Sequence, residues 1–158
     1  MILERSRPLK WIFQRLVNLQ VWVYRRTNGR VWRRWRWGPP VLLLDHVGRK
    51  SGQQRVSPVV YTPNGDDLLV VASYGGSEKD PIWWLNLKAN PRTTVQVGGE
   101  HREVVARLAN PEEKAAVWPK LCEANSDYAK YQEKTERDIP VVILSPVSDS
   151  AVAGGVSH

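Results

Sequence analysis

The first regular pattern along the chain is an apolar period of three to four residues close to its start. The positions that carry it are Leu9, Ile12, Phe13, Leu16, Leu19 and Val23. This spacing is typical of an amphipathic helix. Ser6 precedes the pattern as a candidate N-cap, and Asn28-Gly29 follows it as a stop signal. Trp11, Trp22 and Tyr24 widen the apolar stripe of the predicted helix.

From residue 40 onward the pattern changes to short runs of β-branched and apolar residues, which favour strands. Six strands are predicted, over residues 40–47, 55–62, 67–74, 93–97, 102–109 and 139–146. Asn64-Gly65 and Gly98-Gly99 are typical of tight turns between antiparallel strands. Six short, mostly antiparallel strands with helices inserted predict a mainly β fold, a small barrel with flanking helices.

Three further helical segments interrupt or follow these strands, over residues 80–90, 110–124 and 126–134. Asp80 and Asn110 are candidate N-caps, because a proline follows each of them in the first helical turn. Residues 147–158 carry neither periodicity nor large apolar side chains, so we expect a disordered tail. The chain then divides into a basic helix and arm (1–37), a barrel (38–146) and that tail.

Composition narrows the class of protein. Hydrophobic residues make up 42% of the 158 positions and charged residues 25%, which is ordinary for a soluble globular domain. A single cysteine, Cys122, excludes a disulfide framework and a cysteine-based zinc site. No apolar run reaches the length of a membrane span, and no secretory signal is evident. No metal-ligand cluster, paired carboxylates or nucleophile motif stands out, so a bound cofactor is expected to carry any chemistry.

The net charge of +7 is concentrated at the N-terminus. Residues 1–37 hold ten Lys or Arg and one Glu, whereas residues 38–158 hold thirteen Lys or Arg and fifteen Asp or Glu. A basic helix with tryptophans can dock on its own domain or lie on a membrane surface. The tryptophans and arginines of residues 30–37 could also bind single-stranded nucleic acid, but the slightly acidic remainder and the lack of an RNA-binding motif make that partner unlikely.

Two loops are candidates for ligand binding. In "GRKSGQQR" (48–55), glycines let backbone N–H groups approach an anion, and Arg49, Lys50, Ser51 and Arg55 add donors. This loop leads into a strand, so it is not a Walker A motif. The alternative to an anion site is a solvated hairpin tip whose charges are incidental. In "SYGGSEKDPIWWLN" (73–86), the adjacent Trp83 and Trp84 should point to different sides of the helix. One could face the core while the other lines a groove or a flat ligand, or both could be structural.

Tyr128 and Tyr131 lie one helical turn apart and could fence a pocket or simply bury their rings. His46 and His101 form no metal or triad spacing, so we interpret both as structural or surface residues. Asp45 and His46 are adjacent in a strand, and their side chains should face opposite sides of the sheet.

Several long strings then point to one known family. They are "GRKSGQQRVSP", "YGGSEKDPIWWLNLKANP", "WPKL" and "DYAKYQ…RDIPVVIL". They resemble the deazaflavin (F420)-dependent nitroreductase family, and the resemblance covers roughly residues 8–146. The resemblance implies a six-stranded split β-barrel, similar to the FMN-binding split barrels, that uses the reduced deazaflavin coenzyme F420.

The resemblance also implies which residues form the site. Arg49, Lys50 and Ser51 match the loop that holds the phosphate region of the coenzyme. The residues that match the lining of the deazaflavin are Arg55, Val56, Ser57, Pro58, Val59 and Val60, then Ala72, Ser73 and Tyr74, then Ile82, Trp83, Trp84, Leu85 and Asn86. Tyr128 matches a tyrosine at the coenzyme and acceptor pocket, and Tyr131 a nearby one. Ser73, Tyr128 and Tyr131 are therefore the candidate catalytic residues, and no metal is expected.

The implied reaction is hydride transfer from reduced F420 to an electron-poor acceptor, either a quinone, an activated alkene or a nitro compound. Val60 and Asn125 stand where a well-studied family member has tyrosines, and Tyr74 where it has a lysine, so activity on bulky nitroaromatics does not follow. A non-catalytic F420 carrier and an FMN-dependent reductase remain alternatives. We expect a cytoplasmic protein, with peripheral contact to the inner face of the membrane through residues 1–37 as one interpretation.

Overall fold

The computed structural model describes residues 7–30, 40–73 and 79–147, and for residues 7–10 it describes the backbone alone. Its elements are α1 (Arg7–Arg26), β1 (Val41–Val47), β2 (Gln54–Val60), β3 (Thr62–Asn64), β4 (Asp67–Val71), α2 (Ile82–Ala89), β5 (Arg92–Val97), β6 (Glu100–Leu108), α3 (Pro111–Ala124), α4 (Asp127–Glu133) and β7 (Val141–Pro146). The predicted cap Ser6, the arm tryptophans, Tyr74 and residues 148–158 of the predicted tail lie outside the described residues.

All seven strands form one antiparallel sheet with the order β2-β1-β5-β6-β7-β4-β3. Six strands were predicted, and that count is wrong because the run 55–62 contains two strands. Residues 54–60 pair with β1, whereas residues 62–64 pair with β4 at the other end of the strand order. Only Tyr61 separates the two, so one segment of chain joins both ends of the sheet and curls it into a barrel.

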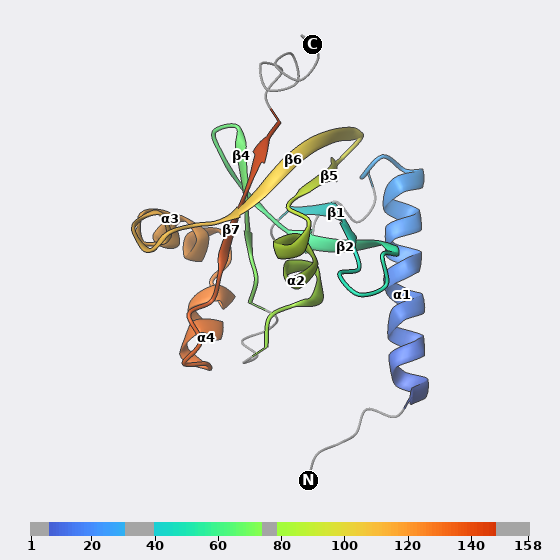
Figure 1. Ribbon diagram of the computed structural model, residues 1–158, viewed down its shortest axis with the longest axis horizontal. Coiled ribbons are helices and arrows are strands. Elements are labelled where there is room, and N and C mark those ends of the chain that lie inside the picture. Colours follow the sequence, from blue (N-terminus) through green and yellow to red (C-terminus); the bar gives the residue numbers. More distant parts are fainter. Residues whose placement is uncertain (1–6, 31–39, 74–78, 148–158) are drawn as a thin grey trace.

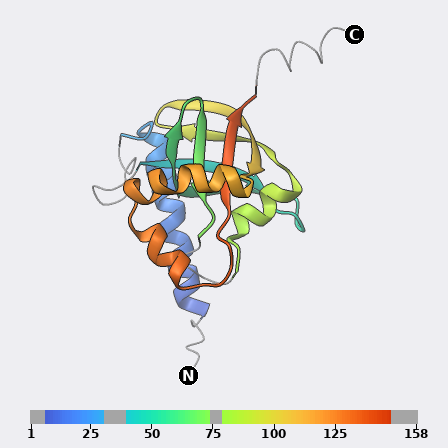
Figure 2. The same ribbon diagram turned by 90° about the vertical axis from the view of Figure 1, so that its left-hand side faces the viewer.

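Alternation along the strands builds two apolar cores. Leu68 and Val70 of β4 face the barrel interior, together with side chains of β1, β5, β6, β7 and α2. Leu69 and Val71 face the other way, onto α3 and α4. Figure 1 shows α1 on one side of the sheet and α3 with α4 on the opposite side. Figure 2 shows α3 and α4 in front of the strands and α1 behind them.

The C-terminal end of α1 is fixed to the barrel by Tyr24, which is fully buried. Its hydroxyl donates to the Val41 carbonyl (3.1 Å) and accepts from the Gly98 N–H (2.8 Å). Asn28 and Gly29 have positive φ angles of 53° and 78°, which confirms the predicted stop signal. Along the rest of α1 several large apolar side chains stay about half exposed. In the described residues, no helix is long and apolar enough to span a bilayer.

The two predicted helix caps have different outcomes. Asn110 caps α3 through a complete capping box with Glu113, as predicted. Asp80 does not cap α2, because that helix begins at Ile82 with Pro81 as its N-cap residue and no side-chain hydrogen bond. The carboxylate of Asp80 instead pairs with two cations, described below.

Candidate active site

One large cavity, of about 1450 Å³, follows β2. It is bounded by α1 on one side and by the beginning of α2 and the region around α4 on the other. The lining residues outside α1 are His46, Gln54, Arg55, Val56, Ser57, Pro58, Val59, Val60, Val71, Ser73, Pro81, Ile82, Trp83, Asn125, Asp127, Tyr128 and Tyr131. Segments far apart in the sequence therefore meet at one concave surface, which is where small-molecule sites form.

The backbone edge of β2 opens toward this cavity. The Tyr61 N–H donates to the Pro40 carbonyl (3.1 Å), and hydrogen-bonded pairs alternate along an antiparallel ladder. In this register, the backbone groups of Ser57 and Val59 face β1, and those of Val56, Pro58 and Val60 face away from it. Pro58, which has no N–H, occupies an outward slot, as expected for an edge strand. The outward edge leaves N–H and C=O groups available to a flat polar ligand.

The two adjacent tryptophans divide as the sequence predicted. Trp84 is buried in the barrel core (4% exposed), whereas Trp83 is half-buried and lines the cavity. Because α2 places successive side chains about 100° apart, one tryptophan can hold the helix on the barrel while the other forms a wall. Ile82, beside Trp83, is exposed and also borders the cavity.

Tyr128 and Tyr131 both border the cavity from α4. The sequence left open whether they fence a pocket or bury their rings, and Tyr128 does both. The Tyr128 ring is buried and packs near Trp118 of α3, with 6.5 Å between ring centroids. Burial raises the pKa of the Tyr128 phenol to about 12, although a hydrogen bond with the Asn125 side chain acts in the opposite direction. Tyr128 therefore stays protonated at neutral pH and remains able to donate a hydrogen bond.

The glycine-containing loop lies next to one end of the cavity. Arg49, Lys50 and Ser51 are exposed and do not belong to the cavity lining, while Arg55, four residues later, does. A β-carbon added to Gly48 would lie 2.4 Å from the Ser51 hydroxyl oxygen and 3.7 Å from the Arg55 Nε. A side chain at Gly48 would displace the Ser51 hydroxyl, so this glycine leaves room for a hydroxyl group in a turn whose sequence also supplies Arg49, Lys50 and Arg55.

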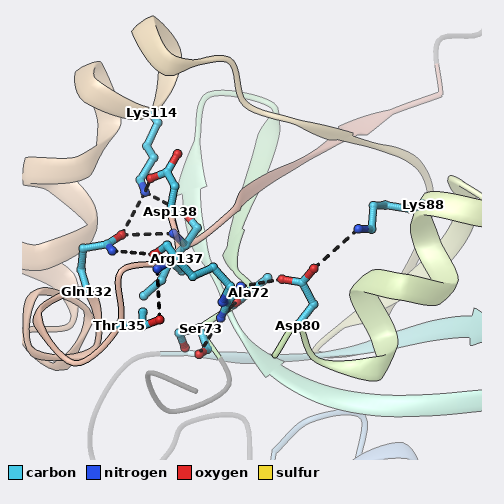
Figure 3. Close-up of polar contacts among 10 residues, drawn as sticks. Ala72, Ser73, Asp80, Lys88, Lys114, Gln132, Thr135, Arg137 and Asp138 are labelled. Atoms are coloured by element: carbon cyan, nitrogen blue, oxygen red, sulfur yellow. Dashed lines mark hydrogen bonds and ion pairs between the residues drawn. The ribbon is translucent and has the colours of Figure 1, made fainter. Parts of the chain in front are cut away.

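A network around Arg137 holds the opposite wall (Figure 3). The guanidinium of Arg137 pairs with Asp80 and donates to the carbonyl oxygens of Ala72 and Ser73, both at 3.3 Å. Asp80 also lies 3.5 Å from the Lys88 ammonium. These contacts connect the end of β4, the residues before α2 and the segment before β7, so they position Ser73 at the cavity.

The same segment is tied to the outer helices. Gln132 of α4 donates to the Arg137 carbonyl (2.8 Å), and its side-chain oxygen accepts from Lys114 of α3 (3.2 Å). Lys114 in turn contacts Asp138 and donates to the Ile139 carbonyl (Figure 3). The two outer helices and the wall that carries Ser73 therefore form one connected unit.

The structure brings together most, but not all, of the residues predicted for the site. Those that line the cavity are Arg55, Val56, Ser57, Pro58, Val59, Val60, Ser73, Ile82, Trp83, Tyr128 and Tyr131. Ala72 and Trp84 are core residues, Leu85 is half-buried outside the lining, and Asn86 is buried behind it. Tyr74 lies outside the described residues.

His46 is the main residue that sequence reasoning missed. It is 4% exposed, lines the cavity and hydrogen-bonds Ser57 and Asn86, so it is not a surface residue. A usable signal was present, since alternation in β1 puts His46 on the same face as Leu42 and Leu44, and a polar side chain there is informative. The cavity-facing side of α1, which includes Phe13 and Leu16, was also missed. The apolar periodicity of a helix predicts an apolar face but not the surface that this face contacts.

Comparisons with known proteins identify the family. The model of the F420H(2)-dependent quinone reductase family matches residues 16–146. The F420H(2)-dependent quinone reductase Rv1261c of Mycobacterium tuberculosis is 41% identical over 133 residues, covering 82% of this chain and 89% of that protein.

Solved structures agree with this match. An F420-H2 dependent reductase (FDR-A) superposes with a TM-score of 0.62 at 39% identity, covering 67% of this chain and 94% of the other. A structure described as a domain-swapped dimer gives 0.64 at 33% identity, covering 87% and 99%. These findings confirm the split-barrel fold and the F420H2-dependent reductase class predicted from the sequence. The chain belongs to the F420H(2)-dependent quinone reductase family.

Proposed function

We propose that this protein transfers hydride from reduced F420 to a quinone bound in the cavity beside β2. The observation that carries the proposal is the meeting of three distant segments at one cavity: β2, the Ser73–Trp83 region and α4. Family membership supports F420 as the coenzyme and a quinone as the acceptor class. The roles of individual residues below are inferred from their positions and chemistry.

The residues present fit the coenzyme. A cavity of about 1450 Å³ exceeds the volume of typical small-ligand pockets, so it has room for a ring system and an acceptor together. The outward backbone groups of Val56, Pro58 and Val60 suit the polar edge of a flat heterocycle. The tight turn at Gly48, with its cations and backbone donors, suits a phosphodiester.

We assign Arg49, Lys50 and Ser51 to the phosphate of the coenzyme. Replacing Arg49 and Lys50 together by Gln should raise the Kd for F420 about tenfold or more, because hydrogen bonds to charged groups contribute about 1.5–3 kcal/mol each. The Arg92→Gln, Lys120→Gln double variant makes the same change of charge at exposed positions outside the cavity. Unchanged F420 affinity in the loop variant would remove the loop from the site.

The bound coenzyme supplies the hydride, from C5 of its reduced deazaflavin ring. We assign to Ser73 and Tyr128, which both line the cavity, the role of donating hydrogen bonds to the acceptor oxygen as negative charge develops on it. The raised pKa of Tyr128 keeps its phenol proton in place for that purpose. Trp83 and the side chains of α1, which include Phe13 and Leu16, give the cavity apolar walls. Tyr131 lies one turn from Tyr128 on the same side of α4.

The test has two stages. The purified protein is first titrated with F420, with FMN as the control; preference for FMN would indicate an FMN-dependent reductase instead. It is then mixed with reduced F420 and menadione, and the absorbance of the oxidised coenzyme is followed against a protein-free control. Oxidation faster than the control supports the proposal. Tight F420 binding without oxidation across several quinones would indicate a carrier.

We further propose that α1 contacts the inner face of the cell membrane, where lipid quinones are found. Trp11 and Trp22 are 58% and 60% exposed and lie three turns apart on one face of the helix. Arg15 and Arg26 repeat on that face with the same spacing, and the Arg15 guanidinium stacks 4.4 Å from the Trp11 ring centroid. Tryptophans and arginines together on an exposed helix face favour an anionic lipid interface.

Flotation with vesicles containing anionic phospholipid tests this contact. The Trp11→Ser, Trp22→Ser double variant should lose vesicle binding. Leu108→Ser is the matched control, since Leu108 is an equally exposed apolar side chain (55%) on β6. Equal flotation of both variants and the unmodified protein would contradict a role for this helix face.

A further inference from the structure

His46 is a buried imidazole at the cavity wall with hydrogen-bond partners on both ring nitrogens. Its Nε2 lies 2.9 Å from the Ser57 hydroxyl oxygen on β2, and its Nδ1 lies 2.9 Å from the Asn86 side-chain nitrogen on α2. The Asn86 side-chain oxygen accepts from the backbone N–H of Arg49 (3.0 Å). These four residues form a chain of hydrogen bonds from the phosphate loop, through α2 and β1, to the cavity.

The donor and the acceptor of each hydrogen bond in this series follow from the first bond, which the Arg49 backbone N–H makes. The Arg49 backbone N–H can only donate, so the Asn86 side chain must present its oxygen to Arg49 and its NH2 group to His46. The His46 Nδ1 must then accept, which leaves the single proton of a neutral imidazole on Nε2. The Nε2–H donates to the Ser57 oxygen, and the Ser57 hydroxyl proton has to find its acceptor elsewhere.

We infer that His46 is a positioning residue that turns the Ser57 hydroxyl into a hydrogen-bond donor to the coenzyme in the cavity. Ser57 lines that cavity, so the acceptor is an oxygen or nitrogen of the bound ring. The inference rests on the proposed function, because it takes the coenzyme as the occupant. Asn86, although buried behind the cavity wall, determines which group donates and which accepts in the hydrogen bonds of His46 and Ser57.

Electrostatics keeps this arrangement intact over the working pH range. Burial first, and the positive charge of Arg55 second, lower the pKa of His46 to about 4. Arg55 reaches His46 from β2, while Asn86 on the α2 side is neutral. Asp45, next along β1, has its carboxylate on the opposite face of the sheet, where it pairs with Arg25 of α1 (3.0 Å). His46 therefore stays neutral at physiological pH, and the proton stays on Nε2.

The tautomer is directly observable. Long-range ¹H–¹⁵N spectra of the histidine rings should show His46 in the neutral Nε2–H form from about pH 6 to 8.5, with no titration. His101, an exposed residue, serves as the internal control. An Nδ1–H tautomer, or titration of His46 within this range, would overturn the inference whether or not the protein binds F420.

Coenzyme affinity tests the role of the hydroxyl. Ser57→Ala should raise the Kd for F420 about three- to tenfold, the usual effect of losing one hydrogen bond to a ligand. Ser145→Ala is the matched control, because Ser145 lies in β7 of the same sheet and does not line the cavity. Equal affinities of the two variants would overturn the inference and leave the proposed function standing.

Asn86→Asp should reverse the hydrogen bonds from a position outside the cavity lining. A carboxylate cannot donate to Nδ1, so neutral His46 would move its proton to Nδ1, and Nε2 would accept the Ser57 proton. The carboxylate would also raise the pKa of His46 into the assay range. The Kd for F420, taken relative to the unmodified protein at each pH, should therefore rise with pH. Asn90→Asp, at the end of the same helix, adds the same charge and should show no such trend.

A double variant separates the hydroxyl from plain charge repulsion. A carboxylate beside a neutral imidazole also repels an anionic coenzyme more at high pH, so Asn86→Asp alone has two explanations. In the double variant Asn86→Asp, Ser57→Ala, the rise of the Kd for F420 with pH should disappear, because residue 57 no longer carries a hydroxyl group. If the trend persists in the double variant, charge alone causes it and the inference is wrong. If the unmodified protein does not bind F420 at all, the proposed function is wrong. The tautomer measurement would then still test the protonation of His46.

Discussion

Removing the guanidinium of Arg137 tests whether the wall that carries Ser73 depends on a partly buried ion pair. Arg137→Met keeps most of the side-chain length and removes every donor. The variant loses the pair with Asp80 and the hydrogen bonds to the carbonyl oxygens of Ala72 and Ser73. Asp80 keeps only Lys88, at 3.5 Å, as a charged partner in the described structure.

The expected loss of stability can be estimated from these contacts. The Arg137 and Asp80 side chains are only 16% and 22% exposed, so solvent screens their attraction weakly. Breaking one partner of a buried pair costs about 3–5 kcal/mol, and hydrogen bonds to charged groups contribute about 1.5–3 kcal/mol each. Because some solvent reaches both groups, we expect the lower end, about 3 kcal/mol. For a domain of this size that corresponds to a decrease in Tm of about 6–12 °C.

Arg107→Met is the matched control. Arg107 makes two hydrogen bonds of 2.7 Å to Glu113, a closer geometry than the contacts of Arg137 with the two carbonyls, but its side chain is 51% exposed. An exposed ion pair contributes about 0–1 kcal/mol. Urea denaturation of both variants measures the difference. If Arg107→Met destabilised the protein as much as Arg137→Met, burial would not be the deciding factor and the estimate would be unsound.

Two further predictions concern α1 and the acid range. Tyr24→Phe leaves the partly buried Gly98 N–H and the Val41 carbonyl without the hydroxyl they share, so the free energy of unfolding in urea should fall by about 2 kcal/mol with the fold retained. An unchanged value would contradict the anchoring role of this hydroxyl. The pKa of Glu113 is lowered from its usual value near 4.5 to about 2, chiefly by the Arg107 hydrogen bonds. Its stabilising effect is present above about pH 4.5 and is lost toward pH 2, so the stability difference between the unmodified protein and Glu113→Gln should shrink over that range.

Local patterns in the sequence predicted the elements well, because local physics decides them. The capping box at Asn110, the stop at Asn28-Gly29 and the alternation of β4 all depend on residues a few positions apart. The strand count failed where pairing partners decide the outcome. Nothing within residues 55–62 reveals that its first part pairs with β1 and its last part with β4.

The candidate cap Asp80 shows the same limit. An aspartate before proline at the start of a helix is a good N-cap by local rules. Here the carboxylate has a stronger partner in Arg137, 57 residues away, and an ion pair with low exposure outweighs one cap hydrogen bond. The sequence contained both residues but no spacing that connects them.

For the site, resemblance to a family predicted segments that the structure brings together at one cavity, and the structure adds how these segments are supported. The strings around Arg49 and Trp83 are recognisable as local runs of sequence, and Trp83 lines the cavity. Arg137 and Asn86 act one step behind the wall, through carbonyl oxygens and a histidine, and such a role leaves no motif. It becomes visible only when the partners of each buried polar group are identified.

His46 illustrates why buried polar groups are worth following to their partners. A buried imidazole at the cavity wall would destabilise the barrel if its nitrogens had no partners, since burying a polar group without hydrogen bonds is costly. Asn86 and Ser57 satisfy both nitrogens, and the backbone N–H of Arg49 determines which nitrogen carries the proton. The backbone N–H of Arg49 thus determines where the protons lie on the Asn86, His46 and Ser57 side chains. A displacement of Arg49 away from Asn86 would remove this constraint, because one set of hydrogen bonds connects the loop of residues 48–55 with the cavity wall at Ser57.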